Sequence, residues 1–395
     1  MGLEHLLSDR TEAMGTNVIR EILKVVNQPG MVSLAGGIPA PESFPMDIFQ
    51  DLCEAVLNKY GSNALQYDVS EGFHPLREAL VPYLQNDKQV KAKFEDILVF
   101  SGSQSVLDNI GKILLSPGDI VALESPSYLG AISAFNAYEP KYIGIETDEH
   151  GMIPESLETV LQNNQVKFVY LVPTFQNPTG RTMTLDRRKQ VAALAEKFNV
   201  LIVEDDPYGA LRYSGTPMPS IQQFAPENVI YVSTFSKILA PGLRVGFCVA
   251  PELIYKWLVK AKQACDLHTS TLSQAISAEY LSGGYLEQQL PKIIELYQPK
   301  RDAMLAAMEE FFPSSFSWTK PDGGMFVWAE GPEGSDAEQL YWKCIDQKVA
   351  FVPGKFFYPD SATQNNATLR LNFTKADEQT IRSAIKTIGD IASKM

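Results

Sequence analysis

The chain has few cysteines, and their spacing gives them no structural task. Its 395 residues include four cysteines, and no two of them stand in the CxxC spacing of a metal or redox motif. Cys248 lies in an apolar run, where a buried thiol is the ordinary interpretation. We therefore expect reduced cysteines and a cytoplasmic protein.

Three further absences narrow the possible functions. Lysine and arginine number 34 against 47 acidic residues, and no basic stripe is long enough to follow a nucleic-acid backbone. Charges interrupt the N-terminal region, and no later apolar run reaches the length that spans a membrane. The four histidines form no HxxxH or HExxH pair. We therefore expect no nucleic-acid partner, no secretion, no membrane insertion and no metal.

Short, uniformly apolar runs are the main feature that is present. They stand at residues 97–100, 120–123, 168–172, 200–203, 229–232 and 245–250. Runs of this kind suit strands that are covered on both faces. Amphipathic helix-length segments separate several of them, as between Leu185 and Phe198. This alternation predicts an α/β fold with a mainly parallel sheet.

The C-terminal region shows a different pattern, which predicts a smaller α+β lobe. A long helix over 295–310, strands at 326–329 and 369–373, a helix opened by a Ser335/Glu338 capping box and a final helix through Ile388 make up this pattern. Residues 30–45 are rich in glycine and proline and predict an irregular surface loop. We expect an N-terminal helix and lid segment (1–45), a large domain (46–288) and a small C-terminal domain (289–395).

Lys237 is the first candidate for chemistry. It lies in SKILAPGLRVGF at 236–247, which follows an expected strand and is interrupted by Pro241 and Gly242. This predicts a tight turn, in which a lysine can be desolvated. A lone lysine is most often a solvated surface residue, so the assignment depends on its neighbours.

Three other segments follow expected strands and carry polar side chains. VEDDPY at 203–208 places two carboxylates at the carboxyl end of a strand, where open α/β sheets bind ligands. SGSQ at 101–104 opens a helix, and Ser103 and Gln104 there suit an anion or serve as an ordinary N-cap. QNPTG at 176–180 forms a turn from which Asn177 could reach the same sheet edge.

Taken in order, SGSQ, PSY, QNPTG, EDDPY and SKILAPGLRVG resemble the class I and II aminotransferases of the type I pyridoxal-phosphate fold. The resemblance runs over nearly the whole chain. It implies a mainly parallel seven-stranded sheet with helices on both faces, a smaller α+β lobe and pyridoxal phosphate as cofactor. The match is closest to the 2-aminoadipate and kynurenine aminotransferase subgroup, through IREILK at 19–24, SLAGGIPAPESFP at 33–45, LQY at 65–67 and CDLHTS at 265–270.

The resemblance also implies a role for each matching residue. Lys237 would form the internal aldimine, and Asp205 would pair with the protonated pyridine nitrogen. The family spacing between this aspartate and Tyr208 selects Asp205 over Asp206. Arg370 would bind the substrate carboxylate with its rigid two-pronged guanidinium. Further positions are Tyr208 and Asn177 at the cofactor's phenolic oxygen, Ser103, Gln104, Ser236 and Arg244 at the phosphate, Tyr128 on the ring, Tyr67 at the neighbouring subunit's phosphate, and Gly37 and Arg20 at the substrate.

The implied activity is a ping-pong transamination in a homodimer with shared active sites. An L-amino acid (2-aminoadipate, aromatic or large aliphatic) would give its amino group to a 2-oxo acid, with 2-oxoglutarate expected, and Arg20 would meet acidic side chains. Another reaction on the same fold, such as β-elimination, is the nearest alternative because the cofactor site does not fix which bond breaks. A ligand-sensing regulator would need a winged-helix domain ahead of residue 19, and a dehydrogenase would need a GxGxxG motif that the chain lacks.

Overall fold

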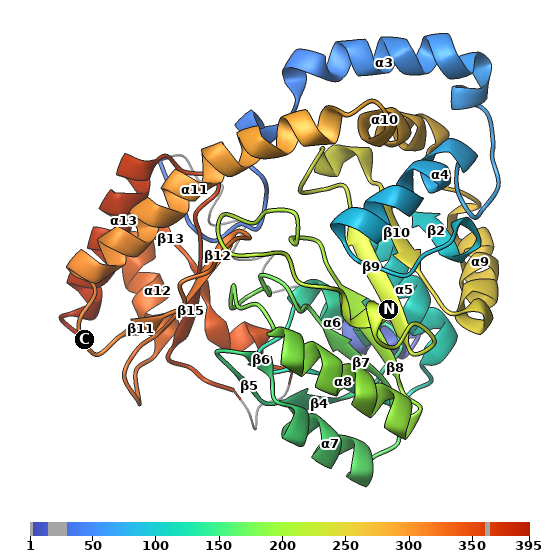
Figure 1. Cartoon of the computed structure of the whole chain (residues 1–395). Coiled ribbons are helices and arrows are strands. Elements are labelled where there is room, and N and C mark those ends of the chain that lie inside the picture. Colours follow the sequence, from blue (N-terminus) through green and yellow to red (C-terminus); the bar gives the residue numbers. More distant parts are fainter. Residues whose placement is uncertain (1–2, 15–29, 360–363) are drawn as a thin grey trace.

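The computed structural model describes residues 3–14, 30–359 and 364–395, which form two lobes (Figure 1). Arg20 and the rest of the IREILK segment lie outside the described residues. At the N-terminus a short 3₁₀ turn (Glu4–Leu6) and helix α1 (Arg10–Met14) are described. No helix in the described part of the chain is long and apolar enough to cross a membrane.

The large lobe is built on a seven-stranded sheet with the order β2-β10-β9-β8-β7-β3-β4. Only β10 is antiparallel to its two neighbours, and the other strand pairs are parallel. The mainly parallel seven-stranded sheet expected from the sequence is therefore confirmed. Its strands are β2 (Ile97–Phe100), β3 (Ile120–Glu124), β4 (Lys141–Ile145), β7 (Val166–Leu171), β8 (Leu201–Asp205), β9 (Val229–Thr234) and β10 (Gly246–Val249).

Helices cover both faces of this sheet, which explains why the strands are apolar throughout. Successive residues of β7 alternate between two cores, with Phe168 and Tyr170 in one and Val169 and Leu171 in the other. The first core is covered by α5 (Ser103–Leu114), α6 (Leu129–Asn136) and α9 (Glu252–Asp266). The opposite face packs against α3 (Met46–Tyr60), α4 (His74–Pro82), α7 (Pro154–Asn163), α8 (Leu185–Phe198) and α10 (Thr271–Ser282). A short hairpin, β5 (Thr147–Asp148) and β6 (Gly151–Met152), precedes α7.

The small lobe contains a four-stranded sheet with the order β11-β12-β15-β14. Its elements are β11 (Ser317–Trp318), β12 (Phe326–Glu330), α12 (Ala337–Asp346), β13 (Val349–Ala350), β14 (Val352–Pro353), β15 (Thr368–Asn372) and α13 (Glu378–Ala392). Helix α13 buries Ile381, Ile385 and Ile388 on one face, as its sequence pattern predicts.

The expected capping box of α12 is wrong. The N-cap is Asp336, whose carboxylate accepts hydrogen bonds from the backbone N–H groups of Glu338 at 2.8 Å and Gln339 at 3.2 Å. Ser335 instead donates its hydroxyl to the carbonyl of Pro332. Aspartate is at least as good an N-cap as serine, and here it lies next to the first turn.

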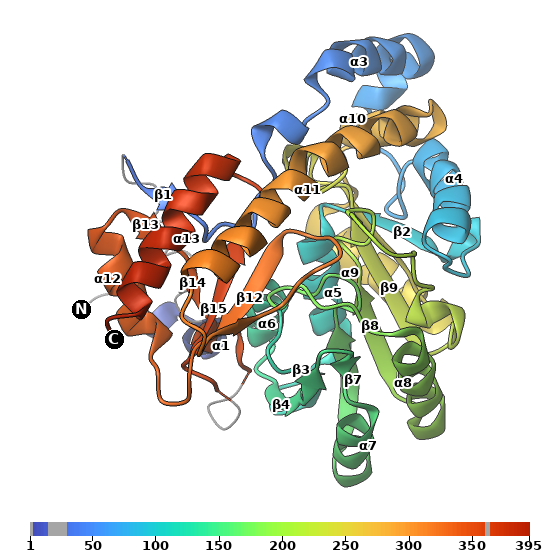
Figure 2. The same cartoon turned by 60° about the vertical axis from the view of Figure 1, so that its left-hand side comes forward.

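Helix α11 (Tyr285–Phe311) passes from the large lobe to the small one, where it packs along α13 (Figures 1 and 2). The proposed domain boundary between residues 288 and 289 falls inside this helix. The division into domains therefore remains a proposal, in which α11 is the element that both lobes share.

Residues 30–45 are irregular, as expected, but parts of the segment are not on the surface. Strand β1 (Val32–Ser33) pairs in parallel with β13 in the small lobe. The N–H of Leu34 donates to the carbonyl of Ala350 and its carbonyl accepts from Asn372, both at 2.7 Å. Leu34 and Ala40 are fully buried. Backbone hydrogen bonds to the small lobe thus hold this segment in the interior.

Candidate active site

Lys237 lies in the turn at residues 236–239, directly after β9. Its Nζ donates to the carbonyl oxygen of Gly37, in the N-terminal segment, at 3.2 Å. Burial, with a smaller effect from the guanidinium groups of Arg244 and Arg370, lowers the pKa of Lys237 to about 8. A substantial fraction of the amine is therefore neutral, and nucleophilic, near neutral pH.

Asp205 is the last residue of β8, on the same sheet edge. Its Oδ2 accepts a hydrogen bond from the Tyr170 hydroxyl at 2.8 Å. Its Oδ1 is buried and has no hydrogen-bond partner in the described part of the chain. Burial raises the pKa of Asp205 to about 7. A buried carboxylate with one free oxygen is what a cationic ligand atom would need.

Asp206, the next residue, is fully committed to the protein. Its carboxylate accepts from Lys88 Nζ at 3.1 Å, the Tyr231 hydroxyl at 2.8 Å and the backbone N–H of Gly209 at 2.8 Å. Burial alone would raise the pKa of Asp206, but Lys88 and Tyr231 lower it overall. The two neighbouring carboxylates therefore differ in environment, and only Asp205 has an oxygen to offer.

Arg370 and Asn177 join the two lobes above this sheet edge. The Arg370 guanidinium donates to Asn177 Oδ1 at 2.8 Å and to the carbonyl of Ala35 at 2.7 Å. It lies between the rings of Phe326 and Phe357, 4.3 and 4.8 Å from their centroids. Its Nε has no partner among the described residues. Burial lowers the pKa of Arg370 to about 10, so the site holds a desolvated cation with a free donor.

Two buried tyrosines, Tyr208 and Tyr128, are the next expected site residues. Asn177 Nδ2 donates to the Tyr208 hydroxyl at 3.3 Å. Burial raises the pKa of both phenols, to about 12 for Tyr128. Both hydroxyls therefore stay protonated over the working pH range and can donate hydrogen bonds.

An anion site lies at the N-terminus of α5. Gly102 precedes the helix with φ of +89°, and a Cβ there would lie 2.4 Å from a terminal nitrogen of Arg244. That guanidinium donates to the carbonyl of Ser101 at 3.3 Å. The helix begins at Ser103 and has no side-chain cap hydrogen bond, so the backbone N–H groups of its first turn and the positive end of its dipole suit an anion there. The Gln104 amide donates to the carbonyl of Gly130 at 2.7 Å, beside this helix end.

The other expected site residues are Ser236, Tyr67, Gly37 and Arg20. The Ser236 hydroxyl contacts that of Thr234 at 2.9 Å. Tyr67 is 78% exposed and meets the ring of His268 edge to face. Gly37 reaches the centre through its backbone carbonyl alone, and Arg20 lies outside the described residues.

Sequence reasoning missed the groups that orient the expected residues. These are Tyr170 at Asp205, Lys88 and Tyr231 at Asp206, and Phe326 and Phe357 around Arg370. The advance signals were the tyrosines inside the apolar runs at 168–172 and 229–232, since a buried phenol needs a partner.

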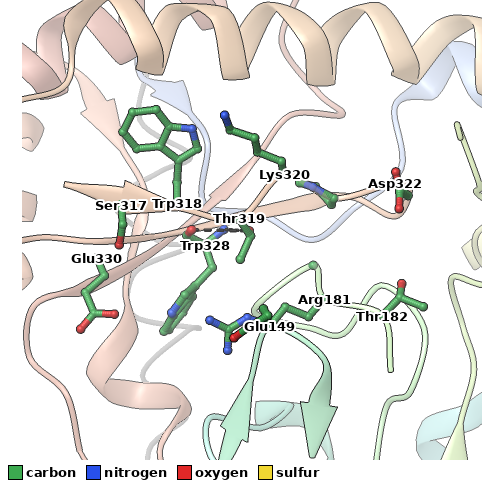
Figure 3. Close-up of a pocket in the computed structure, with 12 residues that line it drawn as sticks. Glu149, Arg181, Thr182, Ser317, Trp318, Thr319, Lys320, Asp322, Trp328 and Glu330 are labelled. Carbon is green, nitrogen blue, oxygen red and sulfur yellow. Dashed lines mark hydrogen bonds between the residues drawn. The ribbon is translucent and has the colours of Figure 1, made fainter. Parts of the chain in front are cut away.

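A separate hollow of about 470 Å³ opens beyond the turn that carries Asn177 (Figure 3). Gly180, Arg181 and Thr182 line it from the large lobe, and residues 317–322 line it from the small lobe. Figure 3 shows Trp328 and Arg181 pointing toward each other across it. Neither Lys237 nor Asp205 contributes to its wall, so this crevice between the lobes is distinct from the candidate active site.

Comparison with known proteins gives the family. The model of aminotransferases of class I and II matches residues 33–388. The chain belongs to this family. It is 46% identical to aromatic-amino-acid aminotransferase 1 of Thermococcus litoralis, over 98% of this chain and 94% of that protein.

Two solved structures extend the comparison and confirm the expected subgroup. Kynurenine aminotransferase of Pyrococcus horikoshii, in complex with PMP, has a TM-score of 0.95 at 45% identity and covers 99% of this chain and 98% of its own. The α-aminoadipate aminotransferase LysN of Thermus thermophilus, complexed with N-(5'-phosphopyridoxyl)-L-leucine, has a TM-score of 0.91 at 36% identity, with 100% and 99% covered. The type I fold is confirmed by these neighbours.

The chain is a pyridoxal-phosphate-dependent aminotransferase. Two features of its own structure fit this cofactor. The free oxygen of Asp205 suits a protonated pyridine nitrogen. The helix end at Gly102, with Arg244 beside it, suits a phosphate. The described residues contain no group of three or more histidine, cysteine, aspartate or glutamate side chains that could hold a metal ion.

Proposed function

We propose that Lys237 and Asp205 are the two residues on which amino-group transfer depends. The observation that supports this most strongly is that both side chains follow neighbouring strands and meet one edge of the sheet. There a lysine with a pKa of about 8 follows β9, and the neighbouring parallel strand β8 ends in a buried carboxylate that keeps one oxygen free. Pyridoxal phosphate, when bound, supplies the electron sink that accepts the charge left by removal of the substrate Cα proton.

Lys237 has two tasks in this proposal. In the resting enzyme its amine would hold the cofactor, and its lowered pKa favours the neutral, nucleophilic form. When not bonded to the cofactor, the same amine would accept the proton from the substrate Cα as a general base. Asp205 keeps the ring nitrogen protonated, because a carboxylate beside it in a buried site favours the charged form.

The remaining expected residues bind and orient. Tyr208 and Asn177 would donate to the cofactor's phenolic oxygen, and Tyr128 would cover the ring face. Ser103, Gln104, Ser236 and Arg244 would hold the phosphate at the N-terminus of α5. Arg370 binds the substrate carboxylate, which would use the guanidinium donor that lacks a partner. Gly37 lies over the pocket through its carbonyl contact with Lys237.

The substrate range is proposed from the relatives together with the rim of the pocket. Relatives are named for aromatic amino acids, kynurenine and α-aminoadipate. We infer that this chain accepts 2-aminoadipate, aromatic and large aliphatic L-amino acids and passes the amino group to 2-oxoglutarate by a ping-pong mechanism. Arg20 would pair with the distal carboxylate of acidic substrates, whereas an exposed helix arginine is the simpler interpretation.

We also propose a cytoplasmic homodimer with shared active sites. Leu65, Tyr67 and Val69 are 69%, 78% and 53% exposed on one short segment. Neighbouring large apolar side chains exposed together suit an interface more than solvent. In this proposal Tyr67 reaches the cofactor phosphate of the partner subunit.

A panel of amino donors tests the reaction and its range together. Purified holoenzyme is mixed with each donor in the absence of an oxo acid, and the absorbance of the cofactor is followed. A transaminase converts about one equivalent of cofactor to its amine form and stops until 2-oxoglutarate is added. Continuous release of ammonia would instead identify an eliminating enzyme. The donors are 2-aminoadipate, phenylalanine, kynurenine and leucine. The first-order rate of the half-reaction with each donor gives their order of preference.

A further inference from the structure

The Asp206 cluster lies next to the catalytic edge without joining it. Lys88 follows the turn Tyr83–Asp87, far in sequence from β8, yet its side chain is only 7% exposed and that of Asp206 only 10%. The turn closes through a hydrogen bond from the N–H of Val90 to the carbonyl of Leu84 at 2.9 Å. Gln89, with φ of +51°, takes a left-handed conformation there. The backbone is thus shaped to bring one lysine into the interior.

Lys88 is the only cation within ion-pair distance of Asp206 in the described part of the chain. Arg188 lies nearby, but its guanidinium donates to the carbonyls of Met183, Pro173 and Pro219. Glu204 is likewise occupied by the Ser220 hydroxyl and backbone N–H groups. Other titratable or charged groups around the cluster are Tyr83, Asp87, Arg212 and Tyr231.

We propose that Lys88 is a positioning residue for transamination: by pairing with Asp206 it fixes and neutralises that carboxylate, so that Asp205 alone serves the cofactor's ring nitrogen. This inference rests on the proposed role of Asp205. Lys88 touches neither cofactor nor substrate. It acts through Asp206, the sequence neighbour of the residue that does.

The physical need for such a residue follows from the two adjacent carboxylates. Two buried carboxylates that lie close together compete for protons, and one of them becomes neutral unless a cation is near. With Lys88 in place, the Asp206 site carries no net charge, and the Tyr231 and Gly209 hydrogen bonds hold its oxygens away from other partners. Without Lys88, the uncompensated charge of Asp206 would raise further the pKa of Asp205, which burial and Asp206 already raise. Through the cofactor ring that Asp205 would serve, the same charge would favour protonation of the Schiff base at Lys237.

The test is a double-mutant cycle in which each variant changes the charge of the pair, and the Schiff-base pKa is measured from the absorbance of the holoenzyme. The pKa of the Schiff base that Lys237 forms with the cofactor is followed by visible absorbance in Lys88→Met, Asp206→Asn and the double variant. Lys88→Met leaves a negative charge and should raise this pKa by about half a pH unit, while Asp206→Asn leaves a positive charge and should lower it by a similar amount. The double variant should return to within about 0.2 pH units of the wild type, since it carries neither charge.

Controls separate charge from structure. Lys88→Arg should keep the wild-type pKa because it keeps the cation. Lys300→Met removes another lysine that is 8% exposed, like Lys88, but that donates to the carbonyl of Thr374 rather than to a carboxylate. It should not shift the spectrum. Lys88→Met could fail to fold because it leaves an unpaired buried carboxylate, which Asp206→Asn and the double variant do not. In that case the Schiff-base pKa of these two variants is compared with that of the wild type.

Shifts of the same sign in Lys88→Met and Asp206→Asn, or no shift in any variant, would overturn the proposal and leave the pair a structural feature only. The proposed function fails by a different result. If Asp205→Asn retains a near-normal rate of proton abstraction, the role of Asp205 itself is wrong, whatever the double-mutant cycle gives.

Discussion

The floor and the rim of the pocket are built in contrasting ways. On the floor, Lys237, Asp205 and Arg370 are each bonded to the chain through named groups and enclosed by it. As the rim we define Ile38, which follows Gly37, and Tyr67, which is proposed to reach the partner's site; they are 54% and 78% exposed. The difference teaches that one chain fixes the groups proposed for the chemistry, whereas it leaves exposed the groups next to the proposed substrate and partner contacts. Changes to the floor should therefore affect every substrate, and changes to the rim only some.

The largest expected effect is the loss of the covalent link in Lys237→Ala. No other amine is proposed to condense with the cofactor, so borohydride should fix none of it, while the protein stays folded. Mass spectrometry after reduction measures the fixed cofactor, with Lys300→Ala as a matched control that keeps it. Cofactor fixed to another lysine in the Lys237 variant would contradict the assignment of the floor.

Asp205→Asn should slow proton abstraction by several decades, about 4 kcal/mol or more, for all donors alike. The amide cannot keep the ring nitrogen protonated, although the cofactor should still bind. Single-turnover absorbance with phenylalanine and with glutamate measures the rate. Asp206→Asn is the matched control and should lose far less. If Asp206→Asn lost more of the rate than Asp205→Asn, Asp206 rather than Asp205 would serve the ring nitrogen.

Arg20→Ala should separate substrates by charge. We expect the barrier for glutamate and 2-aminoadipate to rise by roughly 2 to 4 kcal/mol, because a desolvated carboxylate loses its partner, and that for phenylalanine to change little. The measurement is the rate of each half-reaction. Equal losses for both classes would mean that Arg20 shapes the pocket rather than recognises charge.

The buried carboxylate of Asp205 should lower the free energy of unfolding of the apoenzyme. The folded pKa of Asp205, about 7, lies above its ordinary value of 3.8, so this group lowers stability progressively as pH rises from about 4 to 7 and fully above that range. Apo Asp205→Asn should therefore exceed the wild type in free energy of unfolding by about 4 kcal/mol at pH 8 and match it near pH 4. Urea unfolding at both pH values measures this. A gap that does not depend on pH would rule out titration of Asp205 as its cause.

The smallest signal is expected from mixed subunits. Lys237→Ala and Tyr67→Ala enzymes should each be inactive, and a mixed dimer should contain one intact site. Random mixing should then restore about a quarter of the wild-type sites, because half of the dimers are mixed and each carries one good site of two. Mixed dimers, verified by mass and still inactive, would place Tyr67 outside the partner's site.

Much of the fold was predictable because its signals are local. Uniformly apolar runs with amphipathic segments between them required a sheet covered on both faces, and the structure has one. The antiparallel insertion of β10 between β2 and β9 was not predictable, since an apolar run carries no direction. The Asp336 cap replaced the expected Ser335 because both residues are good caps and only the backbone decides between them.

The candidate site divides in the same way. The ordered motifs identified Lys237, Asp205, Asn177 and Arg370, and the structure brings them to one edge between the lobes. The choice of Asp205 over Asp206 came from a family spacing, whereas its physical reason is a lysine at position 88, which no local pattern connects to β8. Long-range partners such as Tyr170 at Asp205 depend on strand pairing and are hidden from a sequence taken alone.

The pairing of β1 with β13 has a consequence for the order in which the chain can mature. Residues 32–33 need residues 349–350 as their strand partner, and the segment that follows carries the carbonyls of Ala35 and Gly37 that meet Arg370 and Lys237. During synthesis the N-terminal segment must therefore wait until almost the whole polypeptide has left the ribosome. The large lobe can assemble first, with its reactive lysine still uncovered. A nascent chain thus cannot place the N-terminal segment over its reactive lysine until the small lobe is available to hold that segment.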